Sequence, residues 1–310
     1  MNNYKPEGTL ISDYKNLEYT SSLEGLERAL KLGIILEGRV LLCDAFMNLH
    51  IEFRSGVKGI IPRDECQYSE QDEEIKDIAI LTRVGKIVCF KVIGFKEDGG
   101  RKIAVLSRRR AQMECKEYYV DTLQSGDVIP ARVTHLEHFG AFLDIGCGII
   151  SLLSIDTISV SRIAHPAERI SVGDFIHTVV KSIDEHGRIC VSERELLGTW
   201  EENARLFSEG ETVEGVIRSV EDYGVFVELM PNLAGLAEYR DDVSPGQSCA
   251  VYIKSIIPEK MKIKLIIIDT ADFPTKKLPL RYFVDVDSTY HIDSWKYSPT
   301  SSKKHIETVF

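Results

Sequence analysis

Two short blocks of the sequence place a pair of aromatic rings three residues apart around a glycine. These are Phe139, Gly140 and Phe142 in the block 137–145, and Tyr223, Gly224 and Phe226 in the block 221–229. Both rings of such a pair can reach one surface if the strand bends at its glycine. Exposed rings can stack on flat groups such as nucleic-acid bases, whereas buried rings pack the core of a small barrel. The spacing alone leaves both interpretations open.

Other residue types that could support catalysis or bind a metal do not form a recognisable pattern. Ser161 and His165 lie close in sequence, but no Gly-x-Ser-x-Gly turn and no acidic partner accompany them. The seven cysteines are scattered without a Cys-x-x-Cys pair, which indicates reduced thiols in a cytoplasmic protein. The sequence therefore predicts no enzyme, no metal site and no cofactor.

Each ring block lies inside a longer unit that occurs more than once. A β-branched run precedes the block, a turn follows it, and apolar residues alternate with polar ones, as in antiparallel strands. Matching markers recur in the same order and define a duplicated unit of roughly 65 residues, which indicates internal repeats. The markers are Gly126-Asp127 with Gly210-Glu211, and Val172-Gly173-Asp174 with Pro245-Gly246-Gln247. A third, degraded copy comes first and has Phe46-Met47-Asn48-Leu49 in place of the ring block.

Composition limits the partners of these units. The chain of 310 residues has 44% hydrophobic and 28% charged residues, as is usual for a soluble globular protein, and it contains no apolar run long enough to span a membrane. The N-terminus lacks the apolar segment of a signal peptide. A net charge of −10 argues against duplex DNA as a partner. Any nucleic-acid site must therefore be small and locally basic.

The connecting segments carry helix signals. Ser22 can cap a short amphipathic helix over 21–30, and Thr199 with Glu202 has the spacing of a capping box. Between these segments, Arg108-Arg109-Arg110 is the most concentrated positive charge, and it either clamps phosphate or begins a solvated helix. Near the C-terminus, residues 282–286 and 291–295 have strand-like patterns.

The units have five short strands, an aromatic-Gly-x-Phe second strand, a Val-Gly-Asp entry to the fourth strand and a charged turn before the fifth. In these features they resemble the S1 RNA-binding domain. This domain is an OB-fold barrel repeated in the largest bacterial small-subunit ribosomal protein. The resemblance covers residues 33–268 and is strong in the second and third copies. It implies an all-β fold with helical linkers, in which three five-stranded OB-fold barrels follow one another and the first is degenerate. The expected domains are an N-terminal extension with a short helix (1–32), a degenerate repeat (33–110), a helical linker (111–123), a second repeat (124–193), a helical linker (194–208), a third repeat (209–269) and a C-terminal extension (270–310).

The resemblance also implies an RNA site formed by the two ring positions, a His on strand three, and an Asp and an Arg around the last turn. Carried over to this chain, the expected RNA-binding residues are Phe139, Phe142, Asp184 and Arg188 in the second repeat, and Tyr223, Phe226, Lys260 and Lys262 in the third. The chain departs from the family at the strand-three His, where we align Pro62, Ser151 and Glu238 in the three repeats. In the first repeat both rings of the motif are lost.

The function that the resemblance implies is non-enzymatic binding of single-stranded RNA, on mRNA in translation or RNA metabolism, in the cytoplasm. It leaves the small ribosomal subunit open as a further partner, and it predicts neither membrane nor duplex DNA binding. The alternative is a protein–protein interaction scaffold of the ribosome or another RNA machinery, with weak or no RNA binding of its own. The acidic balance and the degraded first repeat favour that alternative.

Overall fold

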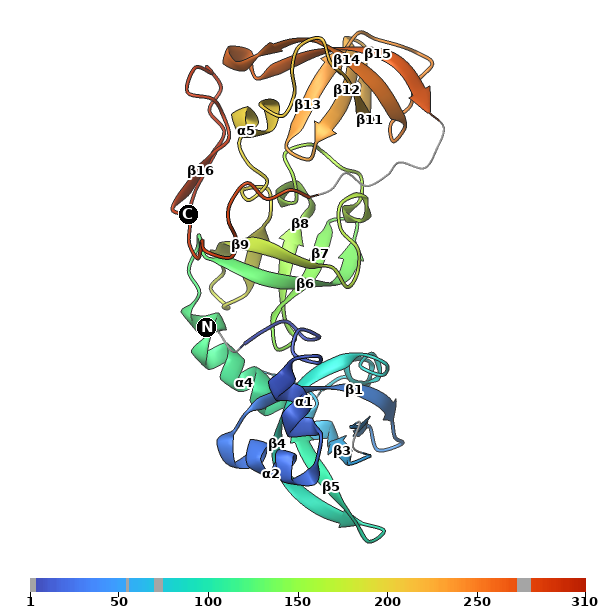
Figure 1. Ribbon diagram of the computed structural model, residues 1–310, viewed down its shortest axis with the longest axis vertical. Coiled ribbons are helices and arrows are strands. Elements are labelled where there is room, and N and C mark those ends of the chain that lie inside the picture. The colour runs from blue at the N-terminus through green and yellow to red at the C-terminus, as the bar shows by residue number, and fades with distance from the viewer. Residues whose placement is uncertain (1–3, 54–55, 70–74, 272–279) are drawn as a thin grey trace. The chain divides into compact units, whose positions relative to one another are not determined.

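The computed structural model describes residues 4–53, 56–69, 75–271 and 280–310, and it contains three closed five-stranded barrels (Figure 1). All three barrels have the same strand order, in which the third strand lies between the second and the fifth. The third and fifth strands of each barrel run parallel to one another. This architecture confirms the all-β prediction of three tandem five-stranded barrels, while the expected domain boundaries stay a prediction.

The strands follow the repeats of the sequence. The first barrel contains β1 (Ile35–Cys43), β2 (Leu49–Glu52), β3 (Lys58–Ile61), β4 (Ile87–Asp98) and β5 (Arg101–Ser107); the second contains β6 (Val128–Glu137), β7 (Gly140–Gly146), β8 (Ile149–Ser154), β9 (Phe175–Ile183) and β10 (Ile189–Ser192); the third contains β11 (Thr212–Glu221), β12 (Gly224–Met230), β13 (Leu233–Ala237), β14 (Ser248–Ile257) and β15 (Lys262–Ala271). A small two-stranded sheet near the C-terminus consists of β16 (Ser294–Lys296) and β17 (Glu307–Val309).

Helices are short and lie between the strands or between the barrels. The α-helices are α1 (Tyr14–Thr20), α2 (Leu23–Leu32), α3 (Asp77–Leu81), α4 (Arg108–Tyr118) and α5 (Trp200–Ala204), and the 3-10 helices are η1 (Arg63–Glu65), η2 (Val120–Thr122), η3 (Ile155–Thr157), η4 (Pro166–Glu168) and η5 (Pro258–Lys260). Within the described ranges, none of these helices has the length and apolar character needed to cross a membrane.

Contacts divide the chain into two compact units, residues 1–123 with 144–150 and residues 124–143 with 151–310. In the first unit, α2 packs Leu26 and Ala29 into the core of the first barrel. The helix begins as predicted, because the hydroxyl of Ser22 accepts a hydrogen bond from the N–H of Gly25 at 3.0 Å. It ends at Gly33, which adopts the left-handed conformation that favours glycine.

The arginine triplet begins a helix, as one interpretation of the sequence predicted, but its first side chain is buried rather than solvated. Arg108 is 1% exposed, and its Nε donates to the Glu7 carboxylate at 2.7 Å. Arg109 pairs with Glu65 at 2.9 Å. Helix α4 begins at Arg108, because the hydroxyl of Ser107 caps it by accepting a hydrogen bond from the N–H of Arg110 at 2.9 Å.

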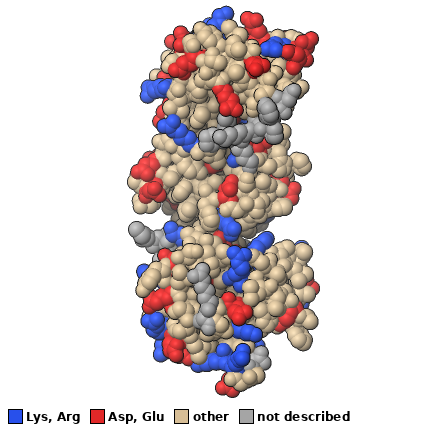
Figure 2. Space-filling model, turned by 45° about the vertical axis from the view of Figure 1, so that its right-hand side comes forward, with Lys and Arg blue, Asp and Glu red and all other residues tan. Residues whose placement is uncertain are grey.

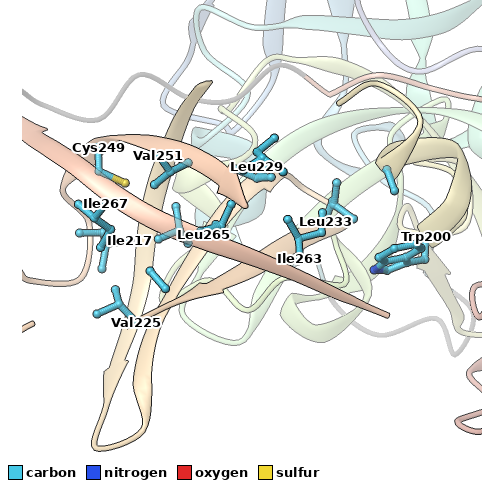
Figure 3. Packing of buried hydrophobic residues seen from close by; sticks show 14 of the residues in the cluster. Trp200, Ile217, Val225, Leu229, Leu233, Cys249, Val251, Ile263, Leu265 and Ile267 are labelled. Carbon is cyan, nitrogen blue, oxygen red and sulfur yellow. The ribbon is translucent and has the colours of Figure 1, made fainter. Parts of the chain in front are cut away.

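In the second unit, the core of the third barrel follows the alternation of its strands (Figure 3). Val225, Val227 and Leu229 of β12 point inward, and Trp200 of α5 joins the same cluster. The Thr199–Glu202 capping box that begins α5 is confirmed. Glu228 occupies an outward position in the alternation of β12, but its side chain is fully buried beneath two arginines.

The arginines that cover Glu228 come from two elements of the second unit. Arg169, which follows η4 of the second barrel, and Arg218 of β11 both donate to the Glu228 carboxylate. Arg218 also pairs with Glu168 of η4. Because a buried carboxylate needs its charge paired and hydrogen-bonded, this cluster ties the loop of the second barrel to strands β11 and β12 of the third.

The C-terminal extension packs along both barrels of the second unit. The predicted strand over 282–286 is wrong, because Tyr282 instead donates its hydroxyl to Glu193 at 3.0 Å and accepts from the N–H of His177 at 2.9 Å. The predicted strand over 291–295 corresponds in part to β16. Trp295 of β16 lies in the core cluster of the third barrel. The extension therefore belongs to the folded structure of the second unit.

We predict that Trp295→Ala lowers the free energy of unfolding by about 3–5 kcal/mol, because it removes a large side chain that is 7% exposed. Tyr290→Ala is the matched control, since Tyr290 lies in the same extension but is 76% exposed, and a change within about 0.5 kcal/mol is expected there. Urea unfolding followed by circular dichroism measures both. Equal effects of the two substitutions would show that the extension is not anchored through Trp295.

Candidate nucleic-acid interface

The two predicted ring pairs have the same geometry in the second and third barrels. The ring centroids of Phe139 and Phe142 lie 6.1 Å apart at an interplanar angle of 87°, and those of Tyr223 and Phe226 lie 6.1 Å apart at 88°. The first ring of each pair is exposed, at 55% for Phe139 and 69% for Tyr223, and the second is half-buried. Neither pair lies in a barrel core, so each presents an aromatic surface to solvent.

The glycine between the rings is required by the backbone of strand three. A Cβ atom at Gly140 would lie 2.3 Å from the carbonyl oxygen of Leu153, and one at Gly224 would lie 2.4 Å from that of Ala237. No side chain fits at that distance. The close crossing therefore explains why both ring blocks contain glycine at the same position.

In the third barrel, a row of outward-facing residues crosses four strands at the second ring. Ser219 of β11 pairs with Phe226, Phe226 with Leu236 of β13, and Leu236 with Lys264 of β15. Directly opposed residues share a face of the sheet, and Lys264 is exposed. Lys264 therefore brings positive charge into the row that holds Phe226.

The two lysines predicted for this site lie farther along the same edge. Lys262 is exposed on the same face of β15, one alternation before Lys264. Lys260 is exposed in η5, in the turn before the strand. Lys264 was not among the RNA-binding residues expected from the sequence. The alternation of lysine with apolar residues over 260–264 nevertheless indicated that these lysines face outward in a row.

In the second barrel, a histidine that sequence reasoning missed extends the aromatic platform, the surface formed by Phe139 and Phe142. The ring of His135 in β6 is stacked on Phe142, with centroids 6.4 Å apart and an interplanar angle of 22°. Its Nε2 lies 2.8 Å from the carboxylate of Glu137. His135 could be recognised only from its position across the β6–β7 hairpin from Phe142. That position depends on the register of the two strands rather than on a local motif.

The structure brings Asp184 and Arg188 together at the turn between β9 and β10. Asp184 accepts hydrogen bonds from the N–H groups of Arg188 at 2.8 Å and His186 at 2.9 Å, and Nε of Arg188 lies 3.2 Å away. These interactions, the Arg188 N–H foremost, hold the pKa of the Asp184 carboxyl below its usual value. Asp184 therefore shapes the turn, while the guanidinium of Arg188 stays accessible to solvent, with 74% of its side chain exposed.

The alignment of the strand-three position needs correction in the second barrel. Leu153 and Ala237 are equivalent, because their carbonyls cross the two motif glycines. The residue that corresponds to Glu238 is therefore Ser154, and Ser151 is 3% exposed. A shift by an odd number of residues moves a side chain to the opposite face of a strand, which is why Ser151 cannot join the platform.

The first barrel has lost the aromatic-Gly-x-Phe motif but keeps one ring at the second ring position. His50 pairs with Ile60 of β3, as Phe226 pairs with Leu236 in the third barrel. Its Nε2 lies 2.9 Å from the carboxylate of Asp44. This barrel therefore presents an imidazole held by a carboxylate in place of the exposed phenyl pair.

The distribution of charged side chains and of possible metal ligands bears on whether the chain holds other kinds of site. On the face that Figure 2 shows, Lys and Arg side chains are interspersed with Asp and Glu. Within the part of the chain that the structure describes, no group of three or more His, Cys, Asp or Glu side chains is arranged to hold a metal ion. His165 caps η4 by accepting from the N–H of Ala167 at 3.0 Å.

We predict that Gly140→Ala lowers the free energy of unfolding by about 1–3 kcal/mol, because its Cβ would clash with a backbone carbonyl that cannot rotate away. Gly94→Ala is the control, since a Cβ there meets nothing within 4 Å and no positive φ is recorded. Urea unfolding of both variants provides the comparison. If the two substitutions cost the same, the close crossing does not constrain the ring block.

Comparison with known proteins finds a matching family over part of the chain. Residues 122–194 match the family described as S1 RNA binding domain. The small ribosomal subunit protein bS1 of Staphylococcus aureus (strain COL) is 28% identical over 275 residues, which cover 83% of this chain and 67% of the relative. The bS1 protein of Staphylococcus saprophyticus is 26% identical with the same coverage.

Among solved structures, a multidomain protein with nucleic acid binding domains from Streptococcus pneumoniae TIGR4 is 14% identical. The match covers 76% of this chain and 74% of that chain, with a TM-score of 0.25. GSP13 from Bacillus subtilis is 26% identical, and the match covers 28% of this chain and 75% of that chain, with a TM-score of 0.24. Residues 122–194 thus match the S1 RNA binding domain, and most of the chain is similar in sequence to bacterial small ribosomal subunit protein bS1.

Proposed function

We propose that this protein is a non-enzymatic, single-stranded RNA-binding protein that acts on mRNA in translation or RNA metabolism. The observation that carries the proposal is the repeated ring pair, exposed with the same edge-to-face geometry in the second and third barrels. The S1 match over residues 122–194 and the homology to bS1 support RNA binding in a translation-related role. We propose the cytoplasm as its place of action and the small ribosomal subunit as a further partner.

The physical basis of binding is stacking, with a small electrostatic contribution. Each base stacked on an exposed ring contributes about 1–3 kcal/mol, and every base offers a flat face for this contact. Lys262 and Lys264 on β15 and the exposed Arg188 in the β9–β10 turn supply positive charge in a chain whose net charge is −10. Because the second and third barrels belong to one compact unit, a single strand that engages both gains avidity.

The proposal predicts that the double substitution Phe142→Ala and Tyr223→Ala weakens RNA binding by at least about tenfold, because each change removes a stacking partner. Fluorescence anisotropy with labelled single-stranded RNA measures the affinity, at two salt concentrations and with duplex DNA as the competitor that should fail to bind. Tyr290→Ala is the control, since it removes an exposed ring that lies outside both platforms. Unchanged affinity in a folded double variant would refute the stacking proposal.

A second prediction concerns Lys264. If its ammonium group contacts phosphate, Lys264→Gln lowers the slope of log affinity against log salt by about 0.7, the value expected for one phosphate contact on a single strand. Lys303→Gln is the control, because Lys303 is exposed in the C-terminal extension, outside the ring row. Anisotropy titrations over a salt series give the slope for each variant. Equal slopes for the two variants would remove Lys264 from the interface.

The alternative, a protein-interaction scaffold, is favoured by one feature of the first barrel. Leu41, Leu42 and Phe46 are 50%, 48% and 80% exposed, so apolar side chains are accessible there while the ring motif is absent. Salt separates the two functions, because RNA binding weakens steeply as salt rises and an apolar protein contact weakens much less. No RNA binding at low salt would favour the scaffold.

A further inference from the structure

Glu238 lies at the end of the ring platform in the third barrel. Along strand β13 the side chain of Leu236 faces outward, that of Ala237 is 4% exposed and faces the core, and Glu238 is exposed on the outer side. Its carboxylate makes no hydrogen bond or ion pair with any other residue that the structure describes, whereas nearby Asp242 is paired with Arg240 at 2.8 Å. An acceptor group with free lone pairs therefore adjoins the platform.

The register of strands β12 and β13 brings this carboxylate close to the rings. Val225 pairs with Ala237, so Glu238, the residue that follows β13, comes beside Gly224, which follows Tyr223. Outward-facing residues two apart on a strand are separated by about 6.8 Å, and neighbouring strands by about 4.8 Å. A base stacked on the rings spans a similar distance, so its edge falls within reach of the Glu238 side chain.

From this arrangement, and on the basis of the proposed function, we infer that Glu238 makes the third barrel selective for guanine. A carboxylate offers two acceptor oxygens side by side, and guanine presents two donors side by side, N1–H and the N2 amino group. Adenine and cytosine present one amino donor beside a ring nitrogen that repels the carboxylate. Uracil presents one N–H donor between two carbonyl oxygens.

The second barrel offers an internal contrast at the same position. Ser154 stands there, and because its hydroxyl donates to the Asp156 carboxylate, it offers a base one acceptor oxygen rather than two. In the third barrel, Lys262 and Lys264 face outward on β15 and can neutralise phosphate while the carboxylate contacts the base. The competing explanation is that Glu238 only repels phosphate and weakens binding of every RNA alike.

The experiment uses the full chain carrying Phe139→Ala and Phe142→Ala, so that binding reports the third barrel. Short labelled RNAs with identical flanks carry guanine, hypoxanthine, adenine, cytosine or uracil at the central position. Discrimination by a bidentate pair is roughly 5- to 150-fold, so guanine should bind at least about fivefold more tightly than adenine, cytosine or uracil. Hypoxanthine, which keeps N1–H but lacks the N2 amino group, should lie between.

Glu238→Gln in the same background tests the residue itself, and Ser154→Ala is its control in the second barrel. Glu238 is exposed, so the variant is expected to fold. Loss of most of the guanine preference in Glu238→Gln, with the preference kept in Ser154→Ala, supports the inference. Equal affinity for all five RNAs, or a uniform increase in Glu238→Gln, overturns the inference but leaves RNA binding intact. Absence of binding to every RNA in this background and in the unmodified chain overturns the proposed function as well.

Discussion

The carbonyl of strand three that crosses the glycine of strand two is the contact on which both ring platforms depend. It leaves no space for a side chain, at 2.3 Å from the Cβ position in the second barrel and 2.4 Å in the third. Because the strands approach so closely at this point, the rings on either side of the glycine project outward. The same crossing sets the register of strand three, and with it which residue, Ser154 or Glu238, adjoins the platform.

The distribution of charge differs from what composition indicates. Arg108, Arg169 and Arg218 are neutralised by buried or partly buried carboxylates, so the positive charge that these residues add to the total is not available to a ligand. Their partners Glu7 and Glu228 are likewise removed from the acidic surface. A local site thus depends on the few cations that strand alternation leaves outside, rather than on the net charge of −10.

Several helix ends and the ring pairs of the candidate site could be predicted from the sequence because their signals are local. The ring-glycine-ring spacing, the capping box of Thr199 and Glu202, and the Ser22 cap each involve residues within a few positions of one another. His135, Ser154 and Lys264 could not be placed in the same way, since their positions relative to the rings follow from pairing between strands. An error of three residues in strand three was enough to select a buried serine in place of the half-buried one on the outer face.

By itself, the sequence determined the number of repeated units and the identity of the rings, because alternation with a period of two and turn residues specify strands locally. The five-stranded barrel was implied by the resemblance to the S1 domain. Only the tertiary structure decided that Glu228 is buried, that Arg108 pairs with Glu7, and that the described part of the C-terminal extension packs along two barrels. The physical reason is that burial of a charge and docking of an irregular segment depend on partners distant in the chain. No local pattern encodes those partners.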